Sequence, residues 1–145
     1  MTMRIGSRQI LSLAFITTLL VVFNSCSITK GREIGEQAVV RFHNQFNAGQ
    51  YSEIYAQSDE GFRKGTSEAD TLALFEAVRR KLGTVKNSNQ TGWRVNATPA
   101  GTMVNLSYDV EFSEGKGTEQ FVFRLNGDKA LLFHYNVNSP LLITK

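Results

Sequence analysis

The chain has 145 residues, which is the usual length of a single domain. A composition of 41% apolar, 20% charged and 10% aromatic residues, with only two prolines, excludes a disordered chain, a collagen and a multi-span membrane protein. One cysteine leaves no partner for a disulfide and excludes a cysteine-based zinc cluster. The formal charge is +3, but Arg4 and Arg8 lie in a segment that we expect to be removed, so the charge does not indicate nucleic-acid binding.

The N-terminus has the pattern of a secretory signal peptide. Arg4 and Arg8 precede an uncharged and mostly apolar run over residues 10–23, and small or polar residues follow it. As a helix, this run would reach about 21 Å, which is short of the roughly 30 Å hydrocarbon core of a bilayer. We therefore predict a signal peptide over residues 1–25 rather than a permanent transmembrane helix.

The end of this segment, Phe23, Asn24, Ser25 and Cys26, resembles the lipobox of bacterial lipoproteins. The resemblance implies that Cys26 is lipidated and becomes the mature N-terminus, and that residues 26–32 are a lipidated cysteine and tether. It also implies a cell-envelope protein that is lipid-anchored to a membrane. In a Gram-negative host, Ser27 after the cysteine implies the outer membrane, facing the periplasm. The rival interpretation is an ordinary cut after Ser27, which would release a soluble protein without Cys26.

Three helical patterns follow in residues 33–145, which we predict to be a single domain. In the first, apolar residues recur at every fourth position, and Gly49 follows where a helix-ending glycine is expected. The second is short. The third begins after Ser67, whose hydroxyl can cap it with Asp70 three residues on, and it ends at Gly83. The apolar positions are Ile34, Ala38, Phe42 and Phe46 in the first pattern, Tyr51, Ile54 and Tyr55 in the second, and Leu72, Phe75, Val78 and Leu82 in the third.

After Gly83 the helical period gives way to the alternation that is typical of half-buried strands. We predict one strand around Trp93 and Val95 and three more over residues 104–112, 121–125 and 131–137. Asn126 and Gly127 are a strong hairpin signal. The residues expected to face the core are Val104, Leu106, Tyr108, Val110 and Phe112, then Phe121, Phe123 and Leu125, and finally Leu131, Phe133, Tyr135 and Val137.

The last hairpin allows two registers. A strict two-residue turn pairs Phe121 with Leu132 and places His134 on the phenylalanine face. Pairing Phe121 with Phe133 needs one more loop residue or a bulge, but it keeps the more apolar face inward. At roughly 25 cal/mol per Å² of apolar area, this difference amounts to several kcal/mol. We therefore predict the second register.

Helices followed by an antiparallel meander indicate an α+β fold, with three N-terminal helices packed on a curved antiparallel sheet of about four strands. Several short stretches punctuate this order: Phe46, Asn47, Ala48, Gly49, Gln50 and Tyr51; Tyr55, Ser58, Phe62 and Arg63; Ser67, Leu82 and Gly83; and the hairpins at Gly115 and at Asn126 and Gly127. The order and these residues resemble the nuclear-transport-factor-2-like superfamily. The resemblance covers about residues 33–140 and implies a cone-shaped domain.

No sequence motif forces an enzymatic interpretation. There is no metalloprotease, P-loop, dinucleotide-binding or serine-hydrolase signature, and there is no thiol after Cys26. His43 and His134 are the two histidines, and the sequence matches neither with a carboxylate. Two histidines are too few for a typical zinc site, so we predict no catalytic residue, no metal and no cofactor.

Three tyrosines, Tyr55, Tyr108 and Tyr135, are candidates to line a pocket inside the domain. Superfamily enzymes such as the ketosteroid isomerases work with a tyrosine donor and a carboxylate inside the cone. Asp109 and Glu111 alternate outward on their strand, so an acid paired with an inward tyrosine is not evident. The alternative interpretation is that the tyrosines are large core residues with a hydroxyl near the rim.

Two functions from different classes are consistent with these patterns. The first is a lipid-anchored, non-catalytic module that binds a protein partner or a small apolar ligand in the cell envelope. Such a module is joined to the membrane through Cys26 and does not bind nucleic acid. The second is a small-molecule isomerase or hydrolase with its site inside the cone. A carboxylate near Tyr55 or Tyr108 in an open interior favours the enzyme, and an interior filled with aromatic rings favours the module.

Overall fold

The computed structural model describes residues 28–144, so the predicted signal peptide and Cys26 lie outside the described residues. One compact unit spans Gly31–Lys145. A long helix runs through residues 28–47, and it includes residues 28–32, where the sequence predicts a tether. None of the helices in the described part of the chain has the length and apolar character needed to cross a bilayer.

Four shorter helices complete the helical part of residues 28–144: α2 (Tyr51–Ala56), α3 (Glu60–Gly65), α4 (Glu68–Leu82) and α5 (Leu141–Thr144). The long helix, α2 and α4 confirm the three predicted helices, but the expectation of only three is wrong. The two additional helices, α3 and α5, contain no buried residue, so neither carries the apolar period by which a helix is predicted. At the start of α3, the Asp59 carboxylate accepts a hydrogen bond from the Gly61 N–H at 2.8 Å.

The ends of the long helix and of α4 lie where the sequence predicts them. Gly49 and Gly83 have φ angles of 73° and 81°, which glycine adopts at low cost. The Ser67 hydroxyl accepts a hydrogen bond from the Asp70 N–H at 3.1 Å and so caps α4. Arg79 Nη1 of α4 donates to the carbonyl oxygen of Asn47 at 3.0 Å, so its guanidinium ties α4 to the end of the long helix.

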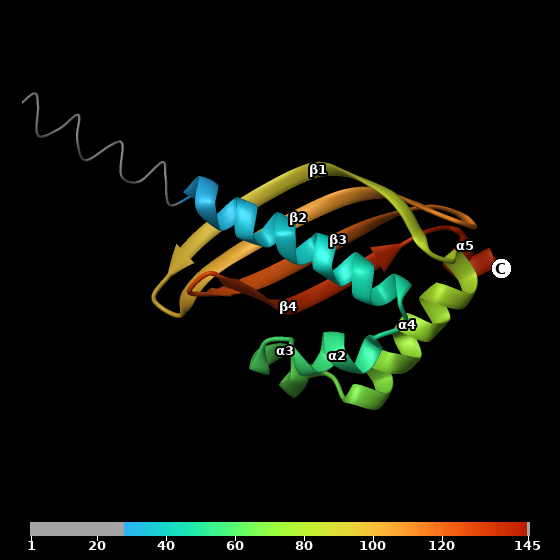
Figure 1. The fold of residues 1–145 in the computed structure, drawn as a ribbon, viewed down its shortest axis with the longest axis horizontal. Coiled ribbons are helices and arrows are strands. Elements are labelled where there is room, and N and C mark those ends of the chain that lie inside the picture. Colours follow the sequence, from blue (N-terminus) through green and yellow to red (C-terminus); the bar gives the residue numbers. More distant parts are fainter. Residues whose placement is uncertain (1–27, 145) are drawn as a thin grey trace, which may run out of the picture. The chain divides into compact units, whose positions relative to one another are not determined.

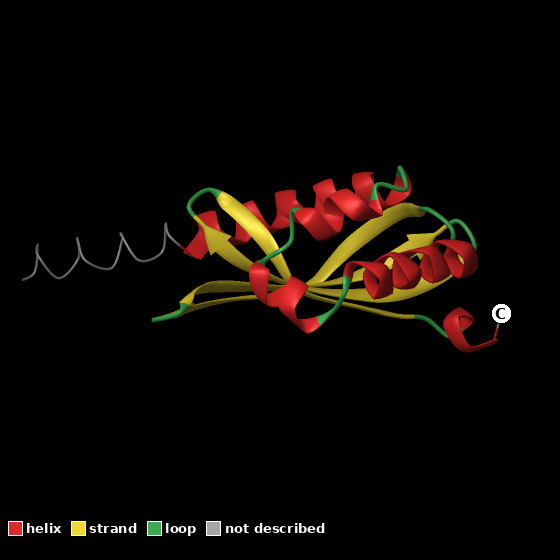
Figure 2. Cartoon of the chain, turned by 90° about the horizontal axis from the view of Figure 1, so that it is seen from below, coloured by secondary structure: helices red, strands yellow, loops and turns green. Residues whose placement is uncertain are grey.

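The sheet is open and antiparallel, with the strand order β1-β2-β3-β4. Its strands are β1 (Val85–Thr98), β2 (Gly101–Phe112), β3 (Gly115–Asn126) and β4 (Lys129–Asn138). In Figure 1 the long helix (blue to cyan) lies over the sheet, and α2, α3 and α4 (green) follow it on the side next to β4. Figure 2 shows the long helix on one side of the sheet. The α+β class and the four-stranded antiparallel sheet are thus confirmed.

The face of the sheet under the long helix carries the hydrophobic core. On β2 the even-numbered residues over 104–112 are buried, while Asp109 and Glu111 are exposed, which confirms the predicted alternation. The long helix approaches β2 closely at Gly35, where a Cβ would lie only 2.8 Å from Val104 Cγ1. The other buried hydrophobic residues are Ala38, Val39, Phe42, Phe46, Ile54, Phe75, Val78, Leu82, Phe121, Phe123, Ala130, Leu132 and Tyr135.

The predicted register of the last hairpin is wrong. Phe121 pairs with Tyr135 rather than with Phe133. The two-residue loop begins one position later than the sequence indicates, because Gly127, with a φ of 59°, is its first residue and Asp128 its second. A glycine at the first loop position is the requirement of a type II′ turn, and this choice shifts the whole pairing of the two strands.

A bulge in the same hairpin changes which face β4 presents to the core. The pairing shifts by one residue between Val122 and Phe123 of β3. Leu132 is buried on one side of the bulge and Tyr135 on the other, so the strand buries both. The two residues that were wrongly expected to face the core, Leu131 and Phe133, are only partly buried.

Candidate functional site

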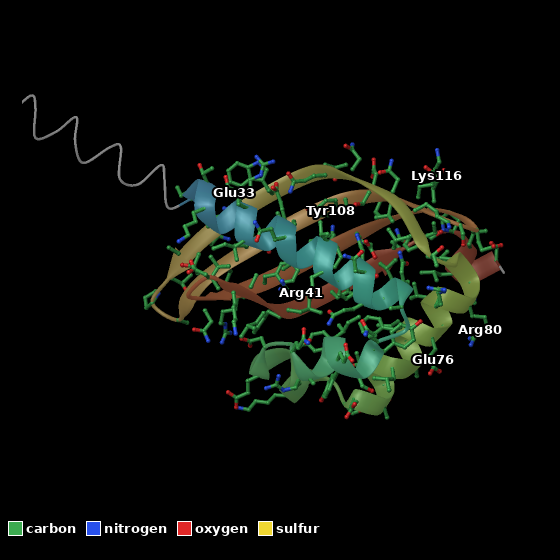
Figure 3. The ribbon with its side chains drawn as sticks, in the orientation of Figure 1. Glu33, Arg41, Glu76, Arg80, Tyr108 and Lys116 are labelled. Carbon is green, nitrogen blue, oxygen red and sulfur yellow. The ribbon has the colours of Figure 1, made fainter. Side chains whose placement is uncertain are left out.

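The three tyrosines that were predicted to line a pocket do not come together. The Tyr55 hydroxyl donates to the Thr66 carbonyl oxygen at 3.2 Å, next to the C-terminal end of α3. Tyr108 lies on β2 (Figure 3). Its hydroxyl accepts a hydrogen bond from Gln90 Nε2 at 3.4 Å, and burial raises the pKa of Tyr108. Within residues 28–144 no hydrogen bond or ring contact joins these tyrosines to one another, and among them Tyr135 alone is hydrogen-bonded to a carboxylate.

A carboxylate, a histidine and a tyrosine form a buried network between the long helix and the sheet. Glu119 on β3 is 1% exposed. Its Oε2 lies 2.6 Å from His43 Nε2 on the long helix, and its Oε1 accepts a hydrogen bond from the Tyr135 hydroxyl on β4 at 2.7 Å. Each oxygen of the buried carboxylate thus has a donor at short range. Such hydrogen bonds offset the free energy that is needed to remove a carboxylate from water.

The buried network overturns two expectations from the sequence. His43, which the sequence does not match with a carboxylate, is 8% exposed and lies against an acid from a distant strand. Glu119 is also the acid paired with an inward tyrosine that the sequence did not reveal. The signal was present in the alternation, because Glu119 has the same parity as Phe121 and Phe123 on β3. Because carboxylates are seldom buried, the sequence alone favours a core made of the apolar residues of this alternation.

The surroundings of the buried network are apolar. The rings of Phe42 and Phe121 have centroids 4.9 and 5.2 Å from that of Tyr135. Burial raises the pKa of Tyr135 well above its usual value, and the negative charge of Glu119 and the hydrogen bond to it raise this pKa further. Tyr135 therefore keeps its proton in the folded protein and donates it to Glu119 in the hydrogen bond.

We expect Tyr135→Phe to flatten the loss of stability at alkaline pH. Above about pH 10 an unfolded tyrosine loses its proton, whereas folded Tyr135 keeps it. The unfolded state then binds fewer protons than the folded state, so the free energy of unfolding falls as the pH rises from about 10 to the folded pKa. For this one group the slope reaches about 1.4 kcal/mol per pH unit. Urea unfolding across this range measures it, and equal slopes for wild type and variant would contradict the raised pKa.

A groove of about 760 Å³ lies between the long helix, the α2–α3 segment and the β3–β4 hairpin. Its apolar floor is formed by Ile34, Ala38, Phe42, Ile54, Phe123 and Leu132. None of the three residues of the buried network lines this groove. Phe42 lines it and also packs against Tyr135, so the Phe42 ring stands between the groove and the buried network.

Charged side chains of both signs surround the groove: Arg41, Arg63 and Lys129 are basic, and Asp59, Glu60 and Asp128 are acidic. Figure 3 shows Arg41 on the side of the long helix that faces β4 and α2. There its Nη2 donates to the carbonyl oxygen of Ala130 at 3.4 Å. The groove therefore combines an apolar floor with a charged rim, and it can hold an apolar group with a polar or ionic end.

The described residues include no group of three or more His, Cys, Asp or Glu side chains that could hold a metal ion. A second hollow of about 500 Å³ lies on the exposed side of the sheet and is lined mainly by polar side chains, among them Asn87, Asp109 and Lys116. The chemistry available in residues 28–144 is thus of two kinds: binding in the groove, and proton exchange within a network that the core encloses.

These features define a class of small α+β domain in which a long helix covers one face of an antiparallel meander, with a filled core and a groove beside β4. The sequence pattern of one family, DUF4019, matches residues 38–133. The chain therefore belongs to this family, which is described as a protein of unknown function. No curated protein matches the chain.

Proposed function

We propose that the protein is a lipid-anchored component of the cell envelope and that its α+β domain is a non-catalytic binding module with its ligand site in the groove. The observation that carries the proposal is that the groove is separate from the buried network. The groove is open to ligands, whereas His43, Glu119 and Tyr135 are packed behind Phe42. A proton-transfer group must lie within about 2.6–3.2 Å of its substrate, so an enclosed group favours a structural role over a catalytic one.

The composition of the groove supports ligand binding. Pockets for small ligands usually have volumes of about 300–1,000 Å³ and an apolar lining with a few polar groups. The groove, at about 760 Å³, has this size and this division between floor and rim. By contrast, the three residues of the buried network are at most 8% exposed, and aromatic rings of the core pack against His43 and Tyr135.

The groove can be tested with a neutral alkyl probe, a decanol that carries a photoactivatable diazirine. With the intact chain in lipid nanodiscs, we expect cross-links on peptides from the long helix, α2 and β4. Gln37→Trp should prevent them, because Gln37 is an exposed residue that lines the groove. Glu33→Trp on the same helix, outside the groove lining, is the matched control and should leave them unchanged. Cross-links that are equal in wild type and Gln37→Trp would reject the groove as the ligand site.

The anchor is tested at Cys26, which lies outside the described residues. Intact-mass analysis of the membrane fraction should give a chain that begins at Cys26 and carries added acyl mass. Cys26→Ala should abolish this species, because the thiol is the acceptor that the lipobox resemblance implies. A soluble product beginning at Ile28 would instead support the ordinary signal-peptide cut and reject the anchor.

We also propose that the domain is a member of the nuclear-transport-factor-2-like superfamily, in which the sheet curls into a cone. Helices followed by a four-stranded antiparallel meander support this assignment. An experimental structure in which the sheet does not curl around the long helix would reject it.

The alternative function is a small-molecule isomerase or hydrolase with its site inside the domain. The buried network favours it, because a carboxylate, a histidine and a protonated tyrosine are groups that can exchange protons with a substrate. For that chemistry the Phe42 ring has to move aside and open a path from the groove to Tyr135.

The two histidines allow a direct test of this opening. Diethyl pyrocarbonate should modify the exposed His134 rapidly and the buried His43 slowly, with each site followed by peptide mass analysis. If exposing His43 costs about 3 kcal/mol of local opening, its rate should be on the order of a hundredfold lower. Equal rates would mean that the interior opens readily, and they would favour the enzyme over the binding module.

A further inference from the structure

We infer that the ligand of the groove is an amphiphilic anion, a single alkyl chain with a carboxylate or phosphate head, and that Arg41 and Lys129 bind the head. This inference rests on the proposed function and adds the chemical class of the ligand. Three observations support it: the ion pairs that the acids of the groove form, the apolar floor beside Arg41, and the hydrogen bonds that the carbonyl groups of β4 already accept.

None of the basic side chains of the groove forms an ion pair with an acid of residues 28–144. The one hydrogen bond that Arg41 makes runs to the carbonyl oxygen of Ala130, at a long 3.4 Å. Arg63 donates to the carbonyl oxygens of Ala56 and Ser58 at the end of α2. Lys129 is exposed and makes no ion pair within residues 28–144. These cations retain donors for an anionic ligand.

Two of the three acidic side chains of the groove are paired with cations that do not line it. Asp59 Oδ1 accepts from the Gly61 N–H and lies 3.6 Å from Arg124 Nη1. Glu60 Oε1 lies 2.7 Å from Lys64 Nζ, and the hydrogen bond and charge of Lys64 lower the pKa of Glu60. Neither Arg124 nor Lys64 lines the groove.

The third acid of the groove, Asp128, is also engaged in an interaction. With Asp59 and Glu60 paired to cations outside the groove, Arg41, Arg63 and Lys129 outnumber Asp128, so the charge that the groove presents to a ligand is positive. A carboxylate or phosphate is the complement that a guanidinium binds best.

The geometry near Arg41 places this positive charge beside the apolar floor. Arg41 reaches the backbone of β4 at Ala130, and Lys129 is the next residue along that strand. Ala38 and Phe42 lie on the floor within one turn of Arg41 on the same helix. A ligand whose head meets Arg41 and Lys129 can therefore lay an alkyl chain on the floor.

The edge of β4 argues against an extended peptide as the occupant. A peptide that adds to a sheet edge needs the free backbone groups of that edge. Two carbonyl groups of β4 beside the groove are already bonded, Ala130 to Arg41 and Leu132 to the Asp59 N–H, the latter at 2.8 Å. A ligand that binds through side chains and apolar contact is compatible with these bonds.

The test uses a decanoate that carries the same diazirine as the neutral decanol probe, on the intact chain in nanodiscs. We expect decanoate to label the groove more strongly than decanol, and unlabelled decanoate or decyl phosphate to compete for it. Arg41→Gln with Lys129→Gln should weaken the apparent affinity for decanoate roughly tenfold, because charge-assisted hydrogen bonds are lost. The decanol labelling should not change. Arg80→Gln on α4, which lies outside the groove lining, is the matched control and should change neither (Figure 3).

The outcomes separate this inference from the proposed function. Equal labelling of the groove by decanoate and decanol, unaffected by the Arg41 and Lys129 variants, would overturn the anionic ligand and leave the groove as a binding site. Labelling by neither probe would overturn both proposals. If decanoate halves the labelling at a lower concentration than decyl phosphate, the head is identified as a carboxylate. The reverse order would identify it as a phosphate, as in a lipid headgroup.

Discussion

Glu119→Ala is expected to lower the free energy of unfolding by about 2–6 kcal/mol, because each of two buried groups that loses its hydrogen-bond partner costs about 1–3 kcal/mol. The substitution removes the acceptor for both His43 Nε2 and the Tyr135 hydroxyl, which lie at 2.6 and 2.7 Å. Both donors are then enclosed by aromatic rings, without a partner. Since small domains have stabilities of about 5–15 kcal/mol, the loss is a large part of the total. Urea unfolding at neutral pH measures it.

The matched control is Glu111→Ala, which removes the same side chain from an exposed position on the neighbouring strand. Its expected effect is within about 0.5 kcal/mol. A double-mutant cycle with His43→Ala should give a combined loss smaller than the sum of the two single losses, because each substitution removes the same contact. If Glu119→Ala cost no more than Glu111→Ala, the buried network would contribute nothing to the stability of the fold.

The sequence predicts the parts of this fold that depend on local periodicity. The alternation on β2, the hydroxyl of Ser67 at the start of α4 and the glycines at the two helix ends all act over a few residues. The strand and the helix ends that they specify do not depend on contacts with distant parts of the chain. For this reason the α+β class and most of the buried hydrophobic residues could be predicted from the sequence.

Features that depend on the meeting of distant segments could not be predicted in the same way. The register of the last hairpin depends on whether Gly127 takes the first or the second loop position, and the bulge beyond it moves Phe133 out of the core. The two choices differ by one residue in the loop. Hydrophobic burial favours a third register, Phe121 with Phe133, because it does not include the φ angle that the turn requires.

In the candidate site, too, local features could be predicted and contacts between distant segments could not. Glu119 could have been placed inside by extending the alternation of β3, but its pairing with His43 joins residues that are 76 positions apart. The groove is assembled from three segments, and its charges become interpretable only when the partners of Asp59 and Glu60 are known. A single sequence carries no direct signal for such contacts.

Phe75→Ala should lower the free energy of unfolding by about 3–5 kcal/mol. Phe75 of α4 is 0% exposed, and its ring centroid lies 5.6 Å from that of Phe42 and 5.8 Å from that of Tyr135. Truncation would leave a cavity where α4 meets the long helix and β4, and it would remove edge-to-face contacts that are worth about 0.5–1.5 kcal/mol each.

Leu74→Ala on the same helix is the matched control, because Leu74 is 47% exposed and its truncation opens no cavity. Urea unfolding of the two variants should therefore give midpoints that are far apart, with Leu74→Ala close to the wild type. Equal midpoints would mean that the packing of Phe75 in the core does not stabilise the fold. If Phe75→Ala also speeds the reaction of His43 with diethyl pyrocarbonate while that of His134 stays constant, the aromatic cluster is what encloses the buried network. An unchanged His43 rate in a destabilised Phe75→Ala variant would assign that enclosure to the Phe42 and Phe121 rings alone.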